Sequence, residues 1–187
     1  MSQTEIIFIR HAEAASSWEN HSDPVLSDLG ITQSKNLIHH NELQKLNNYN
    51  FVSSPKLRAI QTSEYLTKKF NKELVIDNTF IEIPSDNIHL SKKREWFKEL
   101  IKTKKDDLPD NIKKWKDDIL IKTKSFSQNT IIFTHFMVLN LLVSEFKSKD
   151  TLLCFYPDNT SILKIEIKNK EFKNFSTEEG KKTFINL

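Results

Sequence analysis

Five short segments, most of them rich in Ile, Val and Phe, alternate along the chain with helical patterns. They are Glu5–Ile9, Asn50–Ser53, Glu73–Ile76, Thr130–Thr134 and Ser161–Ile167. Near-continuous apolar strands are typical of a sheet covered on both faces, since neither face then meets water. The pattern therefore predicts an α/β three-layer sandwich, with a mostly parallel central sheet and helices on both faces.

Two helical patterns fall between the first three strands. Asp28–Asn41 follows Ser27, which is a good N-cap residue, and Pro55–Phe70 begins with a proline, which suits a first helical position. In the second helix, residues at helical spacing form one stripe that is expected to face the sheet. They are Ala59, Thr62, Ser63, Leu66 and Phe70.

A Lys-rich stretch, residues 83–128, interrupts this alternation. It carries helical patterns near Lys92–Lys102 and Asn111–Ser125, and we interpret it as a lid insertion over one edge of the sheet. Near the C-terminus, Glu171–Phe175 predicts an edge strand of a hairpin, followed by a polar tail that frays. No repeat or Gly/Pro/Ser linker divides the chain, so we expect one domain, 1–187.

Composition limits the classes of partner. The chain has 28 basic and 25 acidic residues, a balance too even for the concentrated basic face of a nucleic-acid-binding protein. A small anionic substrate fits this balance better. The apolar stretch Ile131–Val143 is interrupted by polar residues and is shorter than the roughly 20 residues that span a bilayer, so no membrane partner is expected.

Cysteine usage and the N-terminus bear on location. Cys154 is the single cysteine, so neither an internal disulfide nor a thiolate cluster for zinc or iron–sulfur can form. The apolar run after Glu5 is too short for a signal sequence. A cytoplasmic location is expected, and we interpret Cys154 as a small buried residue with no nucleophilic role.

Polar residues with catalytic chemistry follow the predicted strands. The first strand runs into Arg10-His11 and the fourth into Thr134-His135, while Arg58 lies in the first turn of the helix after the second strand. Glu82 follows the third strand after a short turn. Because ligands of open α/β sheets bind beyond the carboxyl ends of the strands, these side chains are expected to share one crevice.

Several spaced motifs, in order along residues 5 to about 167, resemble the histidine phosphatase superfamily, which also contains the phosphoglycerate mutases. They are Arg10-His11-Ala12-Glu13, Leu26-Ser27-Asp28-Leu29-Gly30, Ser53-Ser54-Pro55, Leu57-Arg58-Ala59, Gln61-Thr62, Phe80-Ile81-Glu82 and Thr134-His135. The resemblance implies that His11 attacks phosphorus to give a phosphohistidine. It also implies that Arg10, Arg58 and His135 bind the phosphoryl oxygens and that Glu82 protonates the leaving oxygen.

The residue chemistry agrees with these roles. Nearby guanidinium groups disfavour the protonated form of a nucleophilic imidazole and match phosphate geometry. A partly desolvated Glu82 beside bound phosphate would keep the proton that an acid needs. No metal or cofactor is required.

The chain departs from the family pattern at three positions. Ala12 replaces the commoner Gly, and Phe136 is bulkier than the usual residue and narrows the pocket. Ser17 stands where the family often has a phosphate-binding Asn, so it is a candidate phosphate contact with one hydroxyl donor.

Alternatives remain open for individual residues. His11 could be a hydrogen-bonded core histidine, His135 a helix cap, Arg58 an ion-pair partner and Glu82 an ordinary lid carboxylate. Three other carboxylates could supply the acid, namely Glu13, Glu95 and Glu99, although Glu13 fits better as support for Arg10 or the local turn. The other histidines are His21, His39, His40 and His89; they lack metal-ligand spacing and are interpreted as surface residues. The basic run Lys92-Lys93-Arg94 is a solvated face or an attractor for acidic substrates.

The leading functional hypothesis is metal-independent hydrolysis of a small phosphorylated metabolite through phosphorylated His11. Alternatives are a protein phosphohistidine phosphatase, a phosphoglycerate mutase-type phosphotransferase and a non-catalytic phosphate-binding protein. The sequence leaves the substrate open, and equally the choice between monomer and homodimer.

Overall fold

The central sheet places strands that are distant in sequence side by side. In this computed structural model, which describes residues 3–17 and 20–178, six strands follow the order β3-β2-β4-β1-β5-β6. Their bounds are β1 (Thr4–Arg10), β2 (Asn50–Ser53), β3 (Leu74–Ile76), β4 (Thr130–Thr134), β5 (Ile162–Lys168) and β6 (Glu171–Thr177). The first four pair in parallel, and β5 and β6 are antiparallel. The predicted mostly parallel sheet is confirmed.

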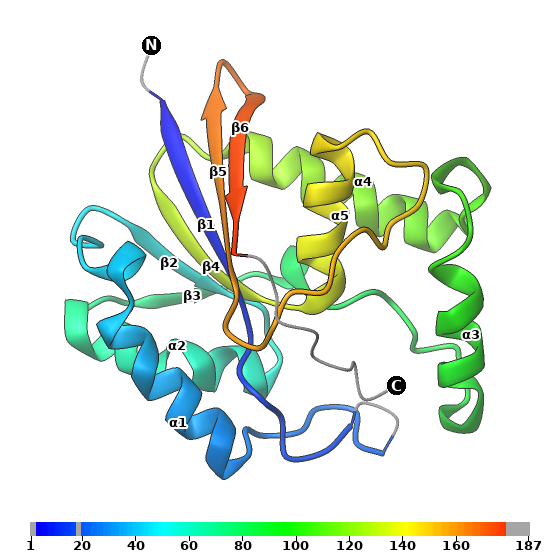
Figure 1. Cartoon of the computed structure of the whole chain (residues 1–187), viewed down its shortest axis with the longest axis horizontal. Coiled ribbons are helices and arrows are strands. Elements are labelled where there is room, and N and C mark those ends of the chain that lie inside the picture. Colours follow the sequence, from blue (N-terminus) through cyan, green and yellow to red (C-terminus); the bar gives the residue numbers. More distant parts are fainter. Residues whose placement is uncertain (1–2, 18–19, 179–187) are drawn as a thin grey trace.

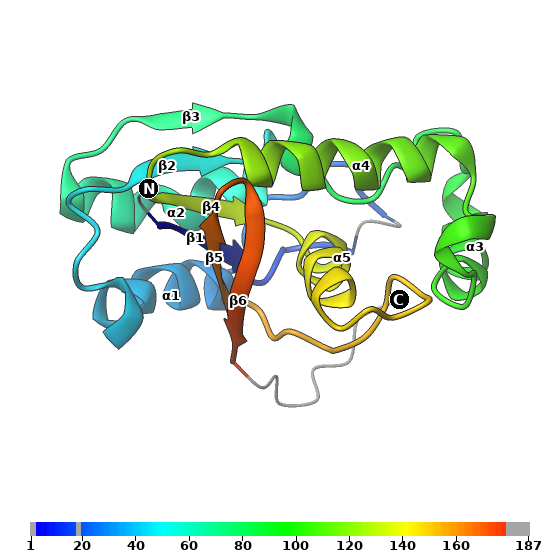
Figure 2. The same ribbon diagram turned by 90° about the horizontal axis from the view of Figure 1, so that it is seen from above.

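Helices cover both faces of this sheet. They are α1 (Asp28–Asn36), α2 (Leu57–Phe70), α3 (Lys93–Leu100), α4 (Asp110–Ser125) and α5 (Phe136–Phe146). Helices α1 and α2 lie on one face, and α4 and α5 lie on the other, which gives the three layers seen in Figures 1 and 2. The predicted three-layer sandwich is confirmed.

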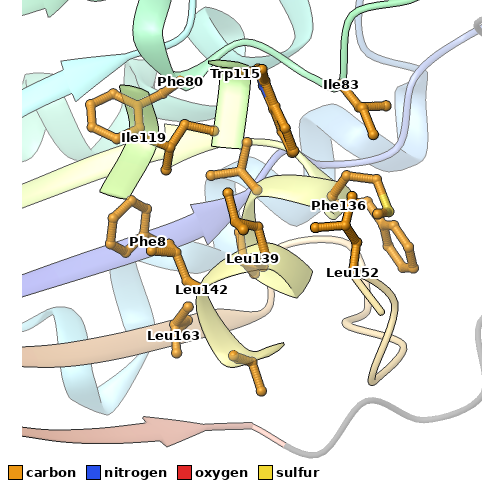
Figure 3. Packing of buried hydrophobic residues seen from close by; sticks show 14 of the residues in the cluster. Phe8, Phe80, Ile83, Trp115, Ile119, Phe136, Leu139, Leu142, Leu152 and Leu163 are labelled. Atoms are coloured by element: carbon orange, nitrogen blue, oxygen red, sulfur yellow. The ribbon is translucent and has the colours of Figure 1, made fainter. Parts of the chain in front are cut away.

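Strand β1 shows how the sequence produces two cores. Successive side chains of a strand point to opposite faces. Ile6 and Phe8 therefore pack into the cluster under α4 and α5, whereas Ile7 and Ile9 pack into the cluster under α1 and α2. Figure 3 shows Phe8 within the first cluster, together with side chains of α4 and α5. Strand β4 is buried at every residue, as its continuous apolar run predicts.

Two helix boundaries differ from expectation. Ser27 caps α1 as predicted, with Oγ accepting from the Gly30 N–H at 2.9 Å, but the α-helix ends at Asn36 and tightens into a 3-10 turn, Leu37–His39. Pro55 is not the first helical residue of α2. Lys56 is extended, and the helix begins at Leu57, whose N–H donates to Asp23 Oδ1 at 2.9 Å. A contact from a distant loop thus sets the start of α2.

The insertion was expected to lie over a sheet edge, but it also contributes to the core. Ile112, Trp115 and Ile119 of α4 are buried in the same cluster as Phe8. Phe97 and Leu100 of α3 also join this cluster, although α3 lies beyond the end of the sheet (Figure 2). The helices of the insertion are therefore amphipathic, with an apolar face in the core and lysines on the face that meets solvent.

The C-terminal hairpin forms as expected. Asn169 and Lys170 both have positive φ, 57° and 60°, which suits the tight turn between β5 and β6. Strand β6 runs to Thr177, two residues beyond the predicted strand, and residues 179–187 of the predicted polar tail lie outside the described part of the chain. Over residues 3–17 and 20–178, no helix combines the length and apolar character needed to cross a bilayer.

Candidate active site

The two histidines meet because β1 and β4 are parallel neighbours. Arg10 pairs with Thr134 at the ends of these strands, and the backbone N–H of His11 donates to the Thr134 carbonyl at 2.8 Å. The rings of His11 and His135 then lie edge to face, with centroids 5.3 Å apart. The predicted crevice at the carboxyl edge of the sheet does bring both side chains together.

The ring of His11 is held in one tautomer. Its Nδ1 lies 2.7 Å from the Ala12 carbonyl, which only accepts, so Nδ1 carries the proton. Nε2 accepts from Arg58 Nε at 3.2 Å, so its lone pair is directed at the guanidinium group. Burial, followed by the charges of Arg58 and Arg10, holds the pKa of His11 well below its usual 6.5. His11 is thus a neutral imidazole with a directed lone pair at neutral pH.

Two guanidinium groups flank this imidazole, one from the buried Arg58 and one from the half-buried Arg10. Arg58 is 6% exposed, and its Nη1 lies 3.8 Å from Asp23 Oδ1. Arg10 donates from Nη1 to the Pro157 carbonyl at 2.7 Å and lies over the Phe136 ring, 5.2 Å from its centroid. Burial lowers the pKa of Arg10 to about 10, so both cations stay charged at neutral pH.

His135 is fully buried beside this pair, at the N-cap position of α5. Its Nε2 lies 2.7 Å from the hydroxyl of Ser54. Burial and nearby positive charge keep the pKa of His135 well below 6.5, so the ring is neutral. If the Ser54 hydroxyl donates to Nε2, the proton is on Nδ1, which has no hydrogen-bond partner among the described residues.

Unpartnered donors point to an anion site. In the described part of the chain, four buried side-chain polar atoms lack a hydrogen-bond partner, and three of them are Arg10 Nε, Arg58 Nη1 and His135 Nδ1. Buried polar atoms without partners are costly, so their gathering at one place calls for a ligand. A tetrahedral oxyanion has enough acceptor oxygens for all three donors.

Glu82 joins the site from the segment after β3. Thr134 Oγ1 donates to the Phe80 carbonyl at 2.7 Å, and Trp115 Nε1 donates to the Ile81 carbonyl at 3.0 Å, which ties this segment to β4 and α4. The Glu82 carboxylate accepts at Oε1 from the backbone N–H groups of Ile83 and Met137, at 2.9 and 3.1 Å. It thereby covers the N-terminus of α5.

The protonation of Glu82 follows from this setting. Burial raises its pKa above the usual 4.5, opposed by the backbone hydrogen bonds and by Arg58 and Arg10. Oε1 already holds two N–H groups, whereas Oε2 receives only a 3.4 Å contact from Met137. Oε2 is therefore the oxygen better placed to carry a proton.

A cavity of about 350 Å³ opens over these groups. Arg10, His11, Arg58 and Glu82 line it, whereas His135 lies behind this first layer. Ser17, the candidate phosphate contact, also lines the cavity, and so does Lys93 of the basic run. Phe136, which was expected to narrow the pocket, forms part of the wall and supports Arg10.

The other candidate acids lie elsewhere or are engaged. Glu95 is exposed and pairs with Lys92 at 3.2 Å, and neither it nor Glu99 lines the cavity. Glu13 lines the cavity, but its Oε1 accepts from the Ser27 hydroxyl at 2.8 Å, which supports the local turn as expected. A Cβ on Gly30 would lie 2.0 Å from the Glu13 carbonyl oxygen, so this contact between turn and helix requires glycine.

The other four histidines and Cys154 were interpreted as surface residues and as an unreactive thiol, respectively. His21, His39 and His89 are exposed, whereas His40 is half-buried and binds Glu178 at 2.6 Å. Burial raises the pKa of Cys154 above its usual value, which disfavours a reactive thiolate. Within residues 3–17 and 20–178, no three His, Cys, Asp or Glu side chains gather in a geometry that could hold a metal ion.

Sequence reasoning missed several residues that support the site. Thr62 Oγ1 accepts from the Ala12 N–H at 2.9 Å, Asn159 Nδ2 donates to the His11 carbonyl at 3.1 Å, and Ser54 binds His135. Thr62 and Ser54 stood within the quoted motifs, so their positions were available but their partners were not. Asn159 and Asp23 lay outside every motif.

Comparison with known proteins agrees with this geometry. Residues 6–177 match the family model described as the histidine phosphatase superfamily (branch 1). A search of curated proteins finds no significant match.

Solved structures share the fold at low identity. YhfR from Bacillus stearothermophilus is 19% identical with a TM-score of 0.73, over 91% of this chain and 94% of that one. A phosphoserine phosphatase from Entamoeba histolytica, solved with 3-phosphoglyceric acid, is 18% identical with a TM-score of 0.67, over 94% and 98% of the two chains. A phosphoglycerate mutase from Bacillus anthracis is 16% identical with a TM-score of 0.66, over 96% and 93%. These similarities establish a common architecture.

Proposed function

Since the chain belongs to the histidine phosphatase superfamily (branch 1), we propose that it hydrolyses phosphomonoesters through a phosphohistidine formed on His11. The observation that carries the proposal is the state of His11. Its neutral ring has the proton fixed on Nδ1 and the lone pair on Nε2, beside the guanidinium groups of Arg58 and Arg10. The nucleophile and the cations of its oxyanion site are therefore already in contact before substrate binds.

In the first step, Nε2 of His11 forms a bond to phosphorus while the bond from phosphorus to the leaving oxygen breaks. The three other oxygens receive hydrogen bonds from Arg10 and Arg58, which line the cavity, and we assign the third to His135, which lies directly behind His11 and donates from Nδ1 when the Ser54 hydroxyl donates to its Nε2. Glu82 gives its proton, from Oε2, to the leaving oxygen, which departs as an alcohol. The positive charge of Arg10 and Arg58 serves where other phosphatases use a metal, so the scheme is metal-independent.

In the second step, water attacks the phosphohistidine. The Glu82 carboxylate takes a proton from this water, and the bond between phosphorus and Nε2 breaks to return the lone pair to His11. Inorganic phosphate leaves, and both His11 and Glu82 regain their starting protonation states. One carboxyl group thus acts first as acid and then as base.

The cavity favours a small substrate. Its volume of about 350 Å³ is at the small end of ligand pockets, and Ile83, Pro84 and Phe97 wall it on the side of the insertion. We therefore propose a small phosphorylated metabolite, with Ser17 as an additional phosphate contact, and neither nucleic acid nor a membrane as a partner. The named activities of two structural neighbours, phosphoserine phosphatase and glucosyl-3-phosphoglycerate phosphatase, concern molecules of this kind.

The proposal is tested by a screen of phosphorylated metabolites and a phosphohistidine peptide, with released phosphate as the readout and His11→Ala as the control. Release from one or more metabolites by the wild type alone supports the proposal. Transfer of phosphate between metabolites without release would favour a mutase. Release from the peptide alone would favour a protein phosphohistidine phosphatase, and binding without release would favour a non-catalytic phosphate-binding protein.

A further inference from the structure

The last part of the segment between α5 and β5, Phe155–Ser161, forms a strap that passes beside the end of β1. The Arg10 N–H donates to the Ser161 carbonyl and the Thr160 N–H donates to the Arg10 carbonyl, both at 3.1 Å. The strap also supplies the Pro157 carbonyl that binds the Arg10 guanidinium at 2.7 Å. It therefore continues the pairing of β1 with β5 up to the nucleophile.

The strap is anchored at its beginning. The buried Asn140 of α5 accepts at Oδ1 from the N–H groups of Cys154 and Phe155, at 2.9 and 3.0 Å. Close to its other end, Thr160 has a φ of 64°, which is costly for a β-branched residue. This backbone conformation follows directly after Asn159, whose side chain donates a hydrogen bond to the His11 carbonyl.

Asn159 and Thr62 hold the two sides of one peptide unit. Asn159 Nδ2 donates to the His11 carbonyl at 3.1 Å, and the N–H of Ala12, in the same peptide plane, donates to Thr62 Oγ1 at 2.9 Å. The orientation of this plane sets the direction of the chain into Ala12. The Ala12 carbonyl in turn accepts from His11 Nδ1, which fixes the tautomer.

We propose that Asn159 is a positioning residue for the nucleophile, acting with Thr62 through the peptide unit between His11 and Ala12. The proposal rests on the proposed function of His11 for its effect on rate. Without the donor on Asn159, this peptide unit is held on one side only, and the Ala12 carbonyl no longer keeps its place under Nδ1. The ring then samples orientations in which Nε2 is off the line of attack.

The experiment compares Asn159→Ala with the wild type, using the surface substitution Asn48→Ala as a matched control. Asn159→Ala should lower kcat about tenfold or more, with KM changed by less than about threefold, because misplacement of a reacting atom affects the chemical step. Asn48→Ala should leave both values unchanged. The substitution Thr62→Val removes the acceptor on the other side of the peptide unit and also the hydroxyl that donates to the Arg58 carbonyl at 2.6 Å, so it should lower kcat at least as much. If Asn159→Ala fails to fold, an unchanged kcat in Thr62→Val would overturn the proposal.

A second readout needs no turnover. Nitrogen-15 chemical shifts of the His11 imidazole report its tautomer in the free protein. Both proteins should show the tautomer with the proton on Nδ1, because Arg58 Nε still donates to Nε2, but Asn159→Ala should shift the Nδ1 signal as its hydrogen bond to the Ala12 carbonyl weakens. An unchanged Nδ1 signal with unchanged kcat, or a rise in KM alone, would overturn the positioning role while leaving phosphatase activity intact. If the wild type itself forms no phosphohistidine, the proposed function fails, and the imidazole spectrum still decides the role of Asn159.

Discussion

Nε of Arg58 donates a hydrogen bond of 3.2 Å to Nε2 of His11. The lone pair of the attacking nitrogen is therefore engaged by the cation that would bind the phosphoryl group. This N–H must turn away before the lone pair can reach phosphorus. An incoming phosphate offers the guanidinium stronger acceptors, because charge-assisted hydrogen bonds exceed those to a neutral imidazole. Substrate binding therefore also frees the lone pair of His11 Nε2 for attack.

This relationship makes Arg58→Lys informative, since lysine keeps the charge but loses the planar fork. We expect kcat/KM to fall about 10²-fold or more, in the range for removal of an oxyanion donor. Arg94→Lys, at the exposed third arginine of the chain, is the matched control and should have no effect. Full activity of Arg58→Lys would show that charge alone suffices.

Covalent chemistry on His11 can be trapped directly. Brief exposure to a labelled phosphomonoester should give an acid-labile, base-stable phosphoenzyme, because the phosphorus–nitrogen bond hydrolyses readily when the ring is protonated. His11→Ala should lose both label and turnover. Label on any other residue, mapped by mass spectrometry, would contradict the mechanism.

The role of Glu82 depends on the leaving group. Glu82→Gln should slow hydrolysis of an alkyl phosphate by roughly 10²-fold or more, the range of general-acid contributions, and slow para-nitrophenyl phosphate much less. The basic limb of the pH profile should also weaken in the variant. Glu95→Gln, at an exposed glutamate outside the cavity, should behave as wild type. If Glu82→Gln slowed hydrolysis of both substrates equally, Glu82 would position the substrate and would not transfer the proton.

Glu82 also makes stability depend on pH. Its pKa is raised above 4.5 in the folded protein, so the folded state favours the protonated form, and this contribution to stability is lost as the pH rises from 4.5 through the raised pKa. Glu82→Gln keeps an acceptor for the Ile83 and Met137 N–H groups and has no proton to lose. We expect the Tm of the variant, measured against pH, to exceed that of wild type increasingly over this window. If the Tm of the two proteins changed in parallel with pH, Glu82 would not be the group that titrates.

Metal dependence offers a separate test. Chelation with EDTA should leave activity unchanged, because Arg10 and Arg58 supply the positive charge that a metal would otherwise provide. Vanadate, which mimics the phosphoryl transition state, should inhibit in competition with substrate. Activity that disappears in EDTA and returns with an added divalent ion would reverse this expectation.

Local pattern was enough to predict the strands and the central residues of the site. Strand β4 is apolar at Ile131, Ile132 and Phe133 and ends directly before His135, so its place in a covered sheet follows from the sequence. The start of α2 was misplaced at Pro55 because Asp23, from a distant loop, binds the Leu57 N–H. Asn159 was missed for the same reason, since its partner His11 lies 148 positions away.

The insertion does more than its composition indicated. Its many lysines suggested an exposed lid, yet Ile112, Trp115 and Ile119 recur at helical spacing and form the buried face of α4. The lysine content indicated only which residues meet solvent, whereas the helical spacing of the apolar residues indicates which ones enter the core.

The place of β4 between β1 and β2 has a consequence for how the protein is made. These two strands pair with β4 and not with each other. A ribosome therefore releases the Arg10-His11 and Arg58 segments well before the strand that joins them. Such late, non-local pairing slows folding and leaves apolar strand edges uncovered in the meantime. The nascent chain should stay sensitive to protease until β4 has emerged, and should then become resistant in one step.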